Sequence, residues 1–463
     1  MPSKPPSTES TASEPTFSRR TAIKAGATAA LAAPMFIPGS ALGQDGRPAP
    51  SERVVMGCIG VGWQGTGNME NFLKHSICQV VAVCDVDTQH LANAKSIVDK
   101  AHGNSDCKTY ADFREVIART DIDALSLGLP DHWHAIPAIM GMKAGKHVWG
   151  EKPLAHTLGE GRAIADTWKQ TGKVWQTGSW QRSVFNFYEA AMAVANGRIG
   201  KVHKVEVGLP SGWSDFANTR QFDQPSDPPA ELDYETWIGP AEMEPYIKAR
   251  HHKNWRWNYN IGGGQLMDWI GHHNDIAHWA LGLDGSAPTR VTGYAHFPDR
   301  SAVWNTAPEY VVISQYADDL EIEIRNAPNL PRNKSAEVGF WLGTKWIGAD
   351  GWVHVDRGKL SASKPEIVDS RKMPYSGSDK QLMKSDDHFL NFLQASHAGD
   401  PKATITNADL SQRAVAPGHL GLISAWLGRS LEWDDAAGKV KNDDAANAML
   451  GRKYRAPWSL EVA

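Results

Sequence analysis

The sequence is poor in cysteine, lacks a long hydrophobic run, and has charges that nearly cancel. Four cysteines among 463 residues are too few for a disulfide scaffold. Lys and Arg number 48 against 52 Asp and Glu, whereas nucleic-acid binders usually carry a net basic surface. No stretch after the N-terminal segment approaches the roughly 18 unbroken apolar residues of a spanning helix. We therefore expect no nucleic-acid partner and no membrane span in the mature chain.

Tryptophan, by contrast, is abundant, with 19 Trp against 12 Phe and 10 Tyr. Indole rings stack on the apolar faces of sugars, although a wide aromatic core would give the same count. The chain is too long for one average domain, so its length predicts two or three. The composition is otherwise that of an ordinary globular protein, with 41% hydrophobic and 22% charged residues.

Residues 1–43 have the pattern of a twin-arginine export signal. Arg19 and Arg20 stand together before a mild run of small and apolar residues, and small residues suited to cleavage follow at 40–43. A disordered basic N-terminus is the alternative. We expect export of the folded protein, a linker over residues 44–53, and a periplasmic or other extracytoplasmic location.

Residues 54–65 have the pattern of a dinucleotide-binding turn. A short apolar strand, 54–59, leads directly into Gly60, Gly62 and Gly65. The first glycine permits the tight turn, the second lets the backbone approach a pyrophosphate, and the third lets a helix pack on the strand. The following helix offers free N–H groups to the phosphates. The pattern alone is weak, and an ordinary glycine-rich turn is the alternative.

A carboxylate strengthens this interpretation. A second strand, 79–84, ends at Asp85, 20 residues after Gly65. A carboxylate at this position accepts hydrogen bonds from the ribose hydroxyls and repels a 2′-phosphate, so NAD is expected rather than NADP. Asp87 has two possible roles, sharing this contact or capping the helix expected over residues 88–100.

Strands and helices continue to alternate through residue 177, as in a parallel sheet. Helices are expected over residues 110–119, 137–144 and 157–170. In such a sheet, the loops at the carboxyl ends of the strands line the ligand crevice. Residues suited to ligand binding or catalysis occur in four of these loops: 60–65, Asp85, 130–134 and 151–153.

Beyond residue 201 the pattern changes to alternating strands, interrupted by a helix expected to end near Gly282. On that helix Asp268, His272 and Asp275 share one side at i, i+4 and i+7, opposite an apolar arc. The carboxylate one turn before His272 is expected to orient the imidazole and raise its basicity. A solvated face with an ion pair is the alternative. His273 falls within the apolar arc and is expected to be a hydrogen-bonded core residue.

The sequence has no HExxH motif and no paired CxxC motif. Asp268 and His272, together with His132 and His134, have metal-capable side chains, but no metal site is expected. Cys58 and Cys84 are expected as buried thiols, and a Cys78–Cys107 disulfide stays open.

Six features follow one another along the chain: the glycine turn, Asp85, the Pro-Asp-His-Trp-His segment 130–134, the Glu-Lys-Pro segment 151–153, Asp268 with His272, and a closing Tyr-Arg-Ala-Pro-Trp at 454–458. In this order they resemble the glucose–fructose oxidoreductase / inositol dehydrogenase (Gfo/Idh/MocA) family, and its exported members in particular. The resemblance implies an α/β fold. An N-terminal Rossmann NAD(P)-binding domain, residues 54–181, precedes a C-terminal α/β domain, residues 182–463, with a large open mixed or antiparallel sheet. It also implies a homo-oligomer, a dimer or tetramer.

Site residues follow from the same resemblance. Lys152 is expected to bind a substrate hydroxyl and the nicotinamide ribose, His272 to act as the base, and Asp268 to bind substrate or support His272. The expected cofactor-binding residues are Gly60, Gly62, Trp63, Gln64, Gly65, Asp85, Pro130, His132, His134, Glu151 and Lys152. Possible substrate contacts, each with an equally good packing explanation, are Trp180, Gln181, Arg182, Asn254, Arg256 and Trp257.

The expected function is NAD-dependent oxidation of a secondary hydroxyl of a sugar, polyol or glycoside. Neutral His272 would take the hydroxyl proton, and cationic Lys152 would stabilise the alkoxide. Because free NAD is scarce outside the cytoplasm, we expect NAD to stay bound and be recycled. Two alternatives remain: a redox-neutral NAD-dependent glycosidase, as in some relatives in the wider family, and a non-catalytic sugar- or cofactor-binding protein.

Overall fold

The computed structural model describes residues 48–326 and 342–461. Residues 52–463 form one compact unit, distinct from residues 1–51. The expected export signal at residues 1–43 lies outside the described residues. Among the helices that are described, none combines the length and apolar character that crossing a membrane requires.

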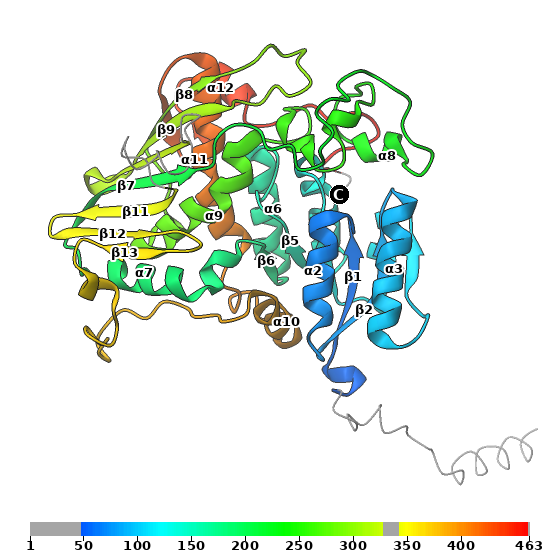
Figure 1. Cartoon of the computed structure of the whole chain (residues 1–463), viewed down its shortest axis with the longest axis horizontal. Coiled ribbons are helices and arrows are strands. Elements are labelled where there is room, and N and C mark those ends of the chain that lie inside the picture. Colours follow the sequence, from blue (N-terminus) through cyan, green and yellow to red (C-terminus); the bar gives the residue numbers. More distant parts are fainter. Residues whose placement is uncertain (1–47, 327–341, 462–463) are drawn as a thin grey trace, which may run out of the picture. The chain divides into compact units, whose positions relative to one another are not determined.

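The first part of the chain builds a six-stranded parallel sheet in the order β3-β2-β1-β4-β5-β6 (Figure 1). The strand order reverses between β1 and β4, which is where doubly wound sheets bind dinucleotides. The strands are β1 (Val54–Ile59), β2 (Cys78–Cys84), β3 (Lys108–Tyr110), β4 (Ala124–Leu127), β5 (His147–Gly150) and β6 (Trp175–Thr177). The helices between them are α2 (Trp63–Leu73), α3 (Thr88–His102), α4 (Phe113–Ala118), α5 (Ala135–Lys143) and α6 (Leu158–Thr171).

A glycine contact brings α2 close to this sheet. A side-chain carbon on Gly65 would lie 1.8 Å from the carbonyl oxygen of Gly60, so no larger residue fits without moving the backbone. Gly60 itself has φ of +75°, a conformation that glycine adopts without strain. The tight turn expected from the sequence is therefore present.

One expected helix starts later than predicted. Residues 110–119 were expected to be helical, but residues 108–110 form β3 beside β2, and α4 covers only Phe113–Ala118. The side chain of Asp112 accepts a hydrogen bond from the backbone N–H of Arg114 and so caps the helix at this point. The helix is therefore present, but it begins three residues later than predicted because Tyr110 pairs with β2 and Asp112 is the cap.

The second part of the chain builds a nine-stranded mixed sheet in the order β13-β12-β11-β7-β10-β9-β8-β14-β15. β7 and β10 pair in parallel, and the other pairs are antiparallel. The strands are β7 (Val202–Leu209), β8 (Arg290–His296), β9 (Glu309–Gln315), β10 (Glu321–Asn326), β11 (Gly343–Gly348), β12 (Gly351–Val355), β13 (Leu360–Ala362), β14 (Leu431–Asp434) and β15 (Lys439–Val440). The expected fold class, a Rossmann domain followed by an α/β domain with a mixed sheet, is confirmed.

Helices cover one face of the nine-stranded sheet. α7 (Phe185–Ala195), α9 (Gly264–Leu281) and α11 (Ala408–Leu427) contact its strands and one another (Figure 1). In β10, Ile322 and Ile324 are buried while Glu321 and Glu323 are partly exposed, which is the alternation of a sheet with one covered face.

The chain returns twice to the first sheet. α10 (His388–Ala398) inserts Phe392 into the core beside α2 and β5, where it contacts Phe72 and Trp149. Near the C-terminus, Trp458 packs edge-on against Trp133, with ring centroids 4.7 Å apart. The closing aromatic motif thus stabilises the loop that follows β4.

The four cysteines are free, buried thiols. Cys58 and Cys84 lie in strands, as expected, and burial raises the pKa of each thiol. Burial also raises the pKa of Cys78 to about 12. The Cys78–Cys107 disulfide left open by the sequence does not form in this structure.

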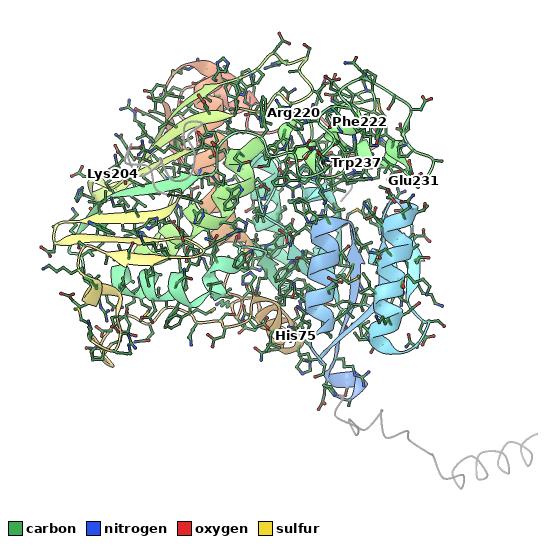
Figure 2. The ribbon with its side chains drawn as sticks, viewed as in Figure 1. His75, Lys204, Arg220, Phe222, Glu231 and Trp237 are labelled. Carbon is green, nitrogen blue, oxygen red and sulfur yellow. The ribbon has the colours of Figure 1, made fainter. Side chains whose placement is uncertain are left out.

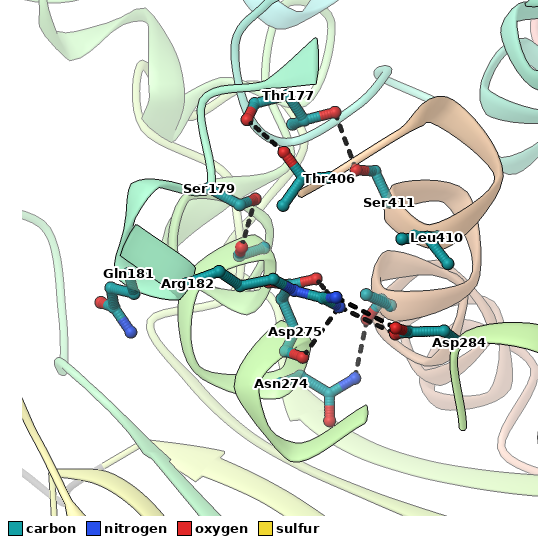
Figure 3. Close-up of polar contacts among 12 residues, drawn as sticks. Thr177, Ser179, Gln181, Arg182, Asn274, Asp275, Asp284, Thr406, Leu410 and Ser411 are labelled. Carbon is teal, nitrogen blue, oxygen red and sulfur yellow. Dashed lines mark hydrogen bonds and ion pairs between the residues drawn. The ribbon is translucent and has the colours of Figure 1, made fainter. Parts of the chain in front are cut away.

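A buried polar cluster fixes α9 to the loop after β6 (Figure 3). Ser179 Oγ donates to the carbonyl of Gly271 at 2.7 Å. The guanidinium of Arg182, 1% exposed, donates to both carboxylate oxygens of Asp275 at 2.8 Å and to Asp284 at 2.8 and 3.0 Å. The side of α9 expected as a polar face is therefore buried against the first domain, and the solvated-face alternative is excluded.

Removing the charge of Arg182 should destabilise the protein. Arg182→Gln leaves Asp275 buried without its counter-ion, and breaking a buried pair typically costs about 3–5 kcal/mol. We expect this loss of free energy of unfolding in urea denaturation followed by tryptophan fluorescence. Arg371→Gln, at a side chain that is 89% exposed and paired with Asp369, is the matched control and should leave the midpoint unchanged. Equal midpoints for the two variants would contradict this role of Arg182.

Candidate active site

The glycine turn and the start of α2 form the floor of a cleft. No side chain caps the N-terminus of α2 at Gly62, so its first N–H groups are available to a phosphate. Asp85 Oδ2 accepts a hydrogen bond from the backbone N–H of Val61 at 2.8 Å, which holds the turn against the end of β2. This arrangement fits a dinucleotide, with its pyrophosphate at the helix terminus and a ribose beside Asp85.

Most of the expected cofactor-binding residues line this dinucleotide cleft. Those that do are Gly60, Gly62, Trp63, Gln64, Asp85, Pro130, Glu151 and Lys152. Gly65 lies behind the turn, where it packs on Gly60. His132 and His134 are buried and do not line the cleft, because their rings contact the backbone carbonyls of Trp237, Pro153 and Leu129.

A second pocket opens from the same cleft. Five residues line both: Trp63, Gln64, Glu151, Lys152 and Arg256. Asp268 and His272, one turn apart on α9, line only the second pocket. The structure therefore brings the three expected catalytic side chains together beside the dinucleotide cleft. We call this second pocket the catalytic pocket.

One carboxylate holds two cations in the catalytic pocket. Lys152 Nζ donates to Asp268 Oδ1 at 2.9 Å, and Arg256 Nε donates to the same oxygen at 2.9 Å. Burial alone would raise the pKa of Asp268, but the charges of Lys152 and Arg256 outweigh it and hold that pKa well below its usual value. Asp268 is thus ionised at neutral pH and fixes the ammonium of Lys152.

His272 has a different environment from the one expected. Asp268 is bound to the two cations and makes no recorded hydrogen bond to the His272 ring, whose Nδ1 is buried without a partner among the described residues. Burial, followed by the charges of Lys152 and Arg357, lowers the pKa of His272 well below its usual value. The charge of Asp268 raises the pKa of His272, as expected, but burial and the neighbouring cations outweigh that effect, so the expected net rise in basicity is wrong. The imidazole is neutral at pH 7 and available to accept a proton.

His273 is a core residue, as expected. It is 1% exposed, and its Nδ1 lies 3.3 Å from Nε2 of Gln181. Its ring stacks on Trp269, with centroids 5.7 Å apart, and Trp269 in turn lines the catalytic pocket beside His272. By its helical periodicity Trp269 falls within the apolar arc of the helix, so the sequence pattern did not indicate its position in the pocket.

Of the possible substrate contacts, Arg256 and Trp180 line the catalytic pocket. Arg182 is held by two carboxylates in the interior, as described above. Asn254 is fully buried and binds Asp215, while Trp257 donates its indole N–H to the carbonyl of Ser214. The structure therefore places Asn254 and Trp257 beneath the loop that carries Phe216, which lines the pocket.

Several pocket residues carried no sequence signal. Asn68 on α2 donates to Glu151 Oε1 at 2.8 Å and so orients the acidic residue before Lys152. Trp149 also lines the pocket and lies in β5, two residues before Glu151. Three others lie far from the motifs in sequence and enter the pocket only through the tertiary fold: Phe216, Arg357 and Phe389.

The segment of residues 210–263 passes over the dinucleotide cleft, and we call it the strap. Figure 2 labels Glu231 and Trp237 within it. The backbone N–H of Thr88 donates to the carbonyl of Glu231, and His252 Nε2 lies 3.1 Å from Asp87 Oδ2. Trp237 and His252 line the same cleft as the glycine turn. The strap thus covers the end of the cleft beside α3.

Asp87, His90 and His252 each place one potential metal-ligand atom within 4.8 Å of the other two. This group differs from the one weighed on sequence. Asp87 Oδ1 also accepts from the N–H groups of Gln89 and His90, which makes Asp87 the cap of α3, one of its two expected roles. The second oxygen of Asp87 binds the strap through His252.

Comparison with known proteins assigns the chain to a family. An oxidoreductase-family model, described as an NAD-binding Rossmann fold, matches residues 54–179, and the model of its C-terminal alpha/beta domain matches residues 187–336. Together they span more than half of the chain, which belongs to the Gfo/Idh/MocA oxidoreductase family. Its first domain is an NAD-binding Rossmann domain.

Similar curated proteins match only part of the chain. A glycosyl hydrolase family 109 protein of Shewanella pealeana is 34% identical over 126 residues, which are 26% of this chain and 27% of that protein. An alpha-N-acetylgalactosaminidase of Shewanella oneidensis is 35% identical over 133 residues, 27% of this chain and 28% of that protein. The match thus spans little more than a quarter of the length of these relatives.

Solved structures share the fold over most of the chain. The WlbA dehydrogenase from Bordetella pertussis, in complex with NADH and UDP-GlcNAcA, superposes with a TM-score of 0.58 at 17% identity, covering 82% of this chain and 99% of that one. A putative myo-inositol dehydrogenase from Sinorhizobium meliloti gives 0.51 at 20% identity, covering 82% and 99%. At 17–20% identity this similarity shows a shared fold and nothing more.

The lowered pKa of His272 predicts an acid-tolerant reaction. A histidine with the usual pKa of about 6.5 would be half protonated at pH 6.5 and would lose half its activity as a base. Because the pKa of His272 in the folded protein lies below 6.5, the imidazole stays neutral at pH 6.5. The fall in rate on the acid side of the pH–rate profile therefore shifts to lower pH. We expect the rate of any reaction that uses His272 as its base, measured under single-turnover conditions, to be unchanged between pH 7.5 and 6.5. A half-loss at pH 6.5 that disappears in His272→Gln would contradict this assignment.

Proposed function

We propose that this protein is an NAD-dependent oxidoreductase that acts on a secondary hydroxyl of a sugar, polyol or glycoside. One observation carries the proposal: Lys152 lines both the dinucleotide cleft and the catalytic pocket that contains Asp268 and His272. A hydroxyl bound at Lys152 is therefore next to the cofactor site and next to a neutral base.

Each residue has a distinct part in this chemistry. NAD, when bound at the glycine turn, supplies the hydride acceptor. Lys152, held by Asp268, binds the hydroxyl oxygen and stabilises the negative charge that develops on it. His272 accepts the hydroxyl proton. Asp268 keeps the ammonium of Lys152 in place, which makes it a positioning residue for Lys152.

The aromatic walls of the pocket favour a sugar-like substrate. Trp63, Trp180 and Phe216 line the pocket, and 49%, 37% and 37% of their side chains are exposed. Exposed rings in a cleft that also holds charged groups suit a ligand with apolar faces and many hydroxyls. The high tryptophan content is thus partly accounted for by the pocket, although Trp175, Trp257 and Trp346 are fully buried.

We propose NAD rather than NADP as the cofactor, because Asp85 lies in the cleft beside the glycine turn. A carboxylate there accepts hydrogen bonds from ribose hydroxyls and repels a 2′-phosphate. Binding of NADP with an affinity equal to that of NAD would contradict this preference.

We also propose that NAD stays bound between turnovers. The strap covers one end of the cleft and is joined to the first domain at Thr88, Asp87 and Gln89. Retention suits the extracytoplasmic location that the twin-arginine pattern in residues 1–43 predicts, because free NAD is scarce there.

A redox-neutral, NAD-dependent glycosidase is a second candidate function. The observation that favours it is the 34–35% identity to glycosyl hydrolase family 109 proteins over about a quarter of their length. Aryl glycosides distinguish the two candidates. Release of the aryl group without net sugar oxidation supports the glycosidase, and accumulation of a keto-sugar without aryl release supports the oxidoreductase.

Variants at Lys152 and His272 test the catalytic assignment. We expect Lys152→Ala and His272→Ala each to lower the rate of hydride transfer by about 10²–10⁴-fold, because one loses alkoxide stabilisation and the other loses the base. The rate is measured as keto-sugar formed per enzyme with excess NAD and a panel of sugars and glycosides. Lys201→Ala and His296→Ala, at exposed residues outside the pocket, should match the unaltered protein. Variants that bind sugar and transfer hydride at the normal rate would remove the catalytic assignment of Lys152 and His272.

The strap predicts slow release of the cofactor. His252→Ala removes the contact with Asp87 without removing the cap of α3. We expect the variant to lose bound nicotinamide nucleotide during dialysis several times faster than the unaltered protein. His296→Ala serves as the control. Equal retention in all three proteins would show that the strap does not hold the cofactor.

A further inference from the structure

Arg357 reaches the catalytic pocket from the turn between β12 and β13. Its guanidinium carbon lies 4.7 Å from the ring centroid of Trp180 and 4.5 Å from that of Trp269. All three residues line the catalytic pocket together with His272. Arg357 therefore presents a positive charge to whatever occupies the space beside His272.

A buried glutamine fixes the direction of this guanidinium. Arg357 Nε donates to Gln181 Oε1 at 3.1 Å. Gln181 is fully buried, and its Nε2 contacts the carbonyl of His272 at 3.3 Å and Nδ1 of His273 at 3.3 Å. Gln181, expected from the sequence to contact substrate, is thus a positioning residue that holds Arg357 by one edge. The two terminal amino groups of Arg357 have no recorded partner among the described residues.

The carboxylates of the pocket are already engaged elsewhere. Asp268 binds Lys152 and Arg256, as shown above. Glu151 accepts from Asn68 Nδ2 at 2.8 Å and from the backbone N–H of Lys152 at 3.3 Å. Among the described residues that line the pocket, three cations therefore face two carboxylates, and Arg357 forms no ion pair.

Arg357 is an exposed residue that lines the pocket, so its terminal amino groups are accessible to a ligand. Partial burial of the guanidinium lowers the pKa of Arg357, and the charge of Asp268 only partly offsets that effect. The planar fork of arginine matches the two oxygens of a carboxylate or sulfate. Arg357 thus has the properties of an anion-binding group that forms no ion pair with the described residues.

We propose that the natural substrate is an acidic sugar, with a carboxylate or sulfate group that pairs with the terminal amino groups of Arg357. This inference rests on the proposed function, because it takes the catalytic pocket to be the sugar site. It adds a substrate class: uronic acids or sulfated sugars, rather than neutral hexoses.

Equilibrium binding tests the inference independently of turnover. The probes are the methyl glycosides of glucuronic, galacturonic and mannuronic acids, the 6-sulfates of the parent hexosides, and the neutral parents. Binding to the cofactor-containing protein is measured by calorimetry. We expect at least one acidic probe to bind about tenfold or more tightly than its neutral parent, which corresponds to about 1.4 kcal/mol. The acidic group whose probes bind more tightly, carboxylate or sulfate, is then the anion that the pocket prefers.

Arg357→Gln should remove this preference and leave binding of the neutral parent unchanged. Arg357→Lys, which keeps the charge but not the fork, should retain part of the preference. Arg300→Gln is the matched control, because it removes an arginine that lies over Trp426, outside the pocket. High salt should weaken binding of the acidic probe and not of its parent in the unaltered protein, which supports the inference without any variant.

The inference is overturned if no acidic probe binds, if neutral parents bind as tightly, or if Arg357→Gln weakens both kinds of probe equally. Its failure is separable from failure of the proposed function. A neutral sugar that is oxidised as fast as any acidic one would overturn the substrate class and keep the oxidoreductase. An acidic sugar that binds through Arg357 but is neither oxidised nor cleaved would keep the proposed ligand class and overturn the proposed function.

Discussion

Docking of α9 onto the loop after β6 is the constraint that assembles this site. Asp268 and His272 lie on α9, whereas Lys152 follows β5 in the other domain, so neither part of the chain contains the site alone. Ser179 ties the two parts together through the carbonyl of Gly271, and Arg182 holds α9 beside it through Asp275. Gly271 allows the contact to be close, since a side-chain carbon there would lie 3.1 Å from Cβ of Lys152.

The docking of α9 also determines which charged groups meet in the pocket. The ammonium of Lys152 reaches Asp268 only because α9 lies against the end of β5, and Asp268 then also binds Arg256. With its carboxylate engaged, Asp268 does little to support a positive charge on His272, and burial keeps that imidazole neutral. A cation for the alkoxide and a neutral base for the proton therefore lie side by side.

The sequence was informative where a motif is local. The glycine turn, Asp85 and Lys152 each follow a short buried strand, and parallel strands bring their carboxyl ends to one edge. It was uninformative where a role depends on a distant partner. Gln181 acts through Arg357, 176 residues away, and α9 is buried on both sides, so its periodicity could not distinguish a solvated face from a domain interface. The placement of Asp268 one turn before His272 was visible, but the burial and the cations that outweigh its effect on the pKa of the imidazole were not.

The most direct test is the absorbance near 340 nm of the protein, dialysed extensively and then mixed with sugars and glycosides without added NAD. We expect that acid releases nicotinamide nucleotide from the dialysed protein, and that one class of sugar raises the absorbance by at most the amount that corresponds to the bound nucleotide. A protein without releasable nucleotide, or one whose bound nucleotide no sugar reduces, would contradict a retained cofactor beside Lys152 and His272.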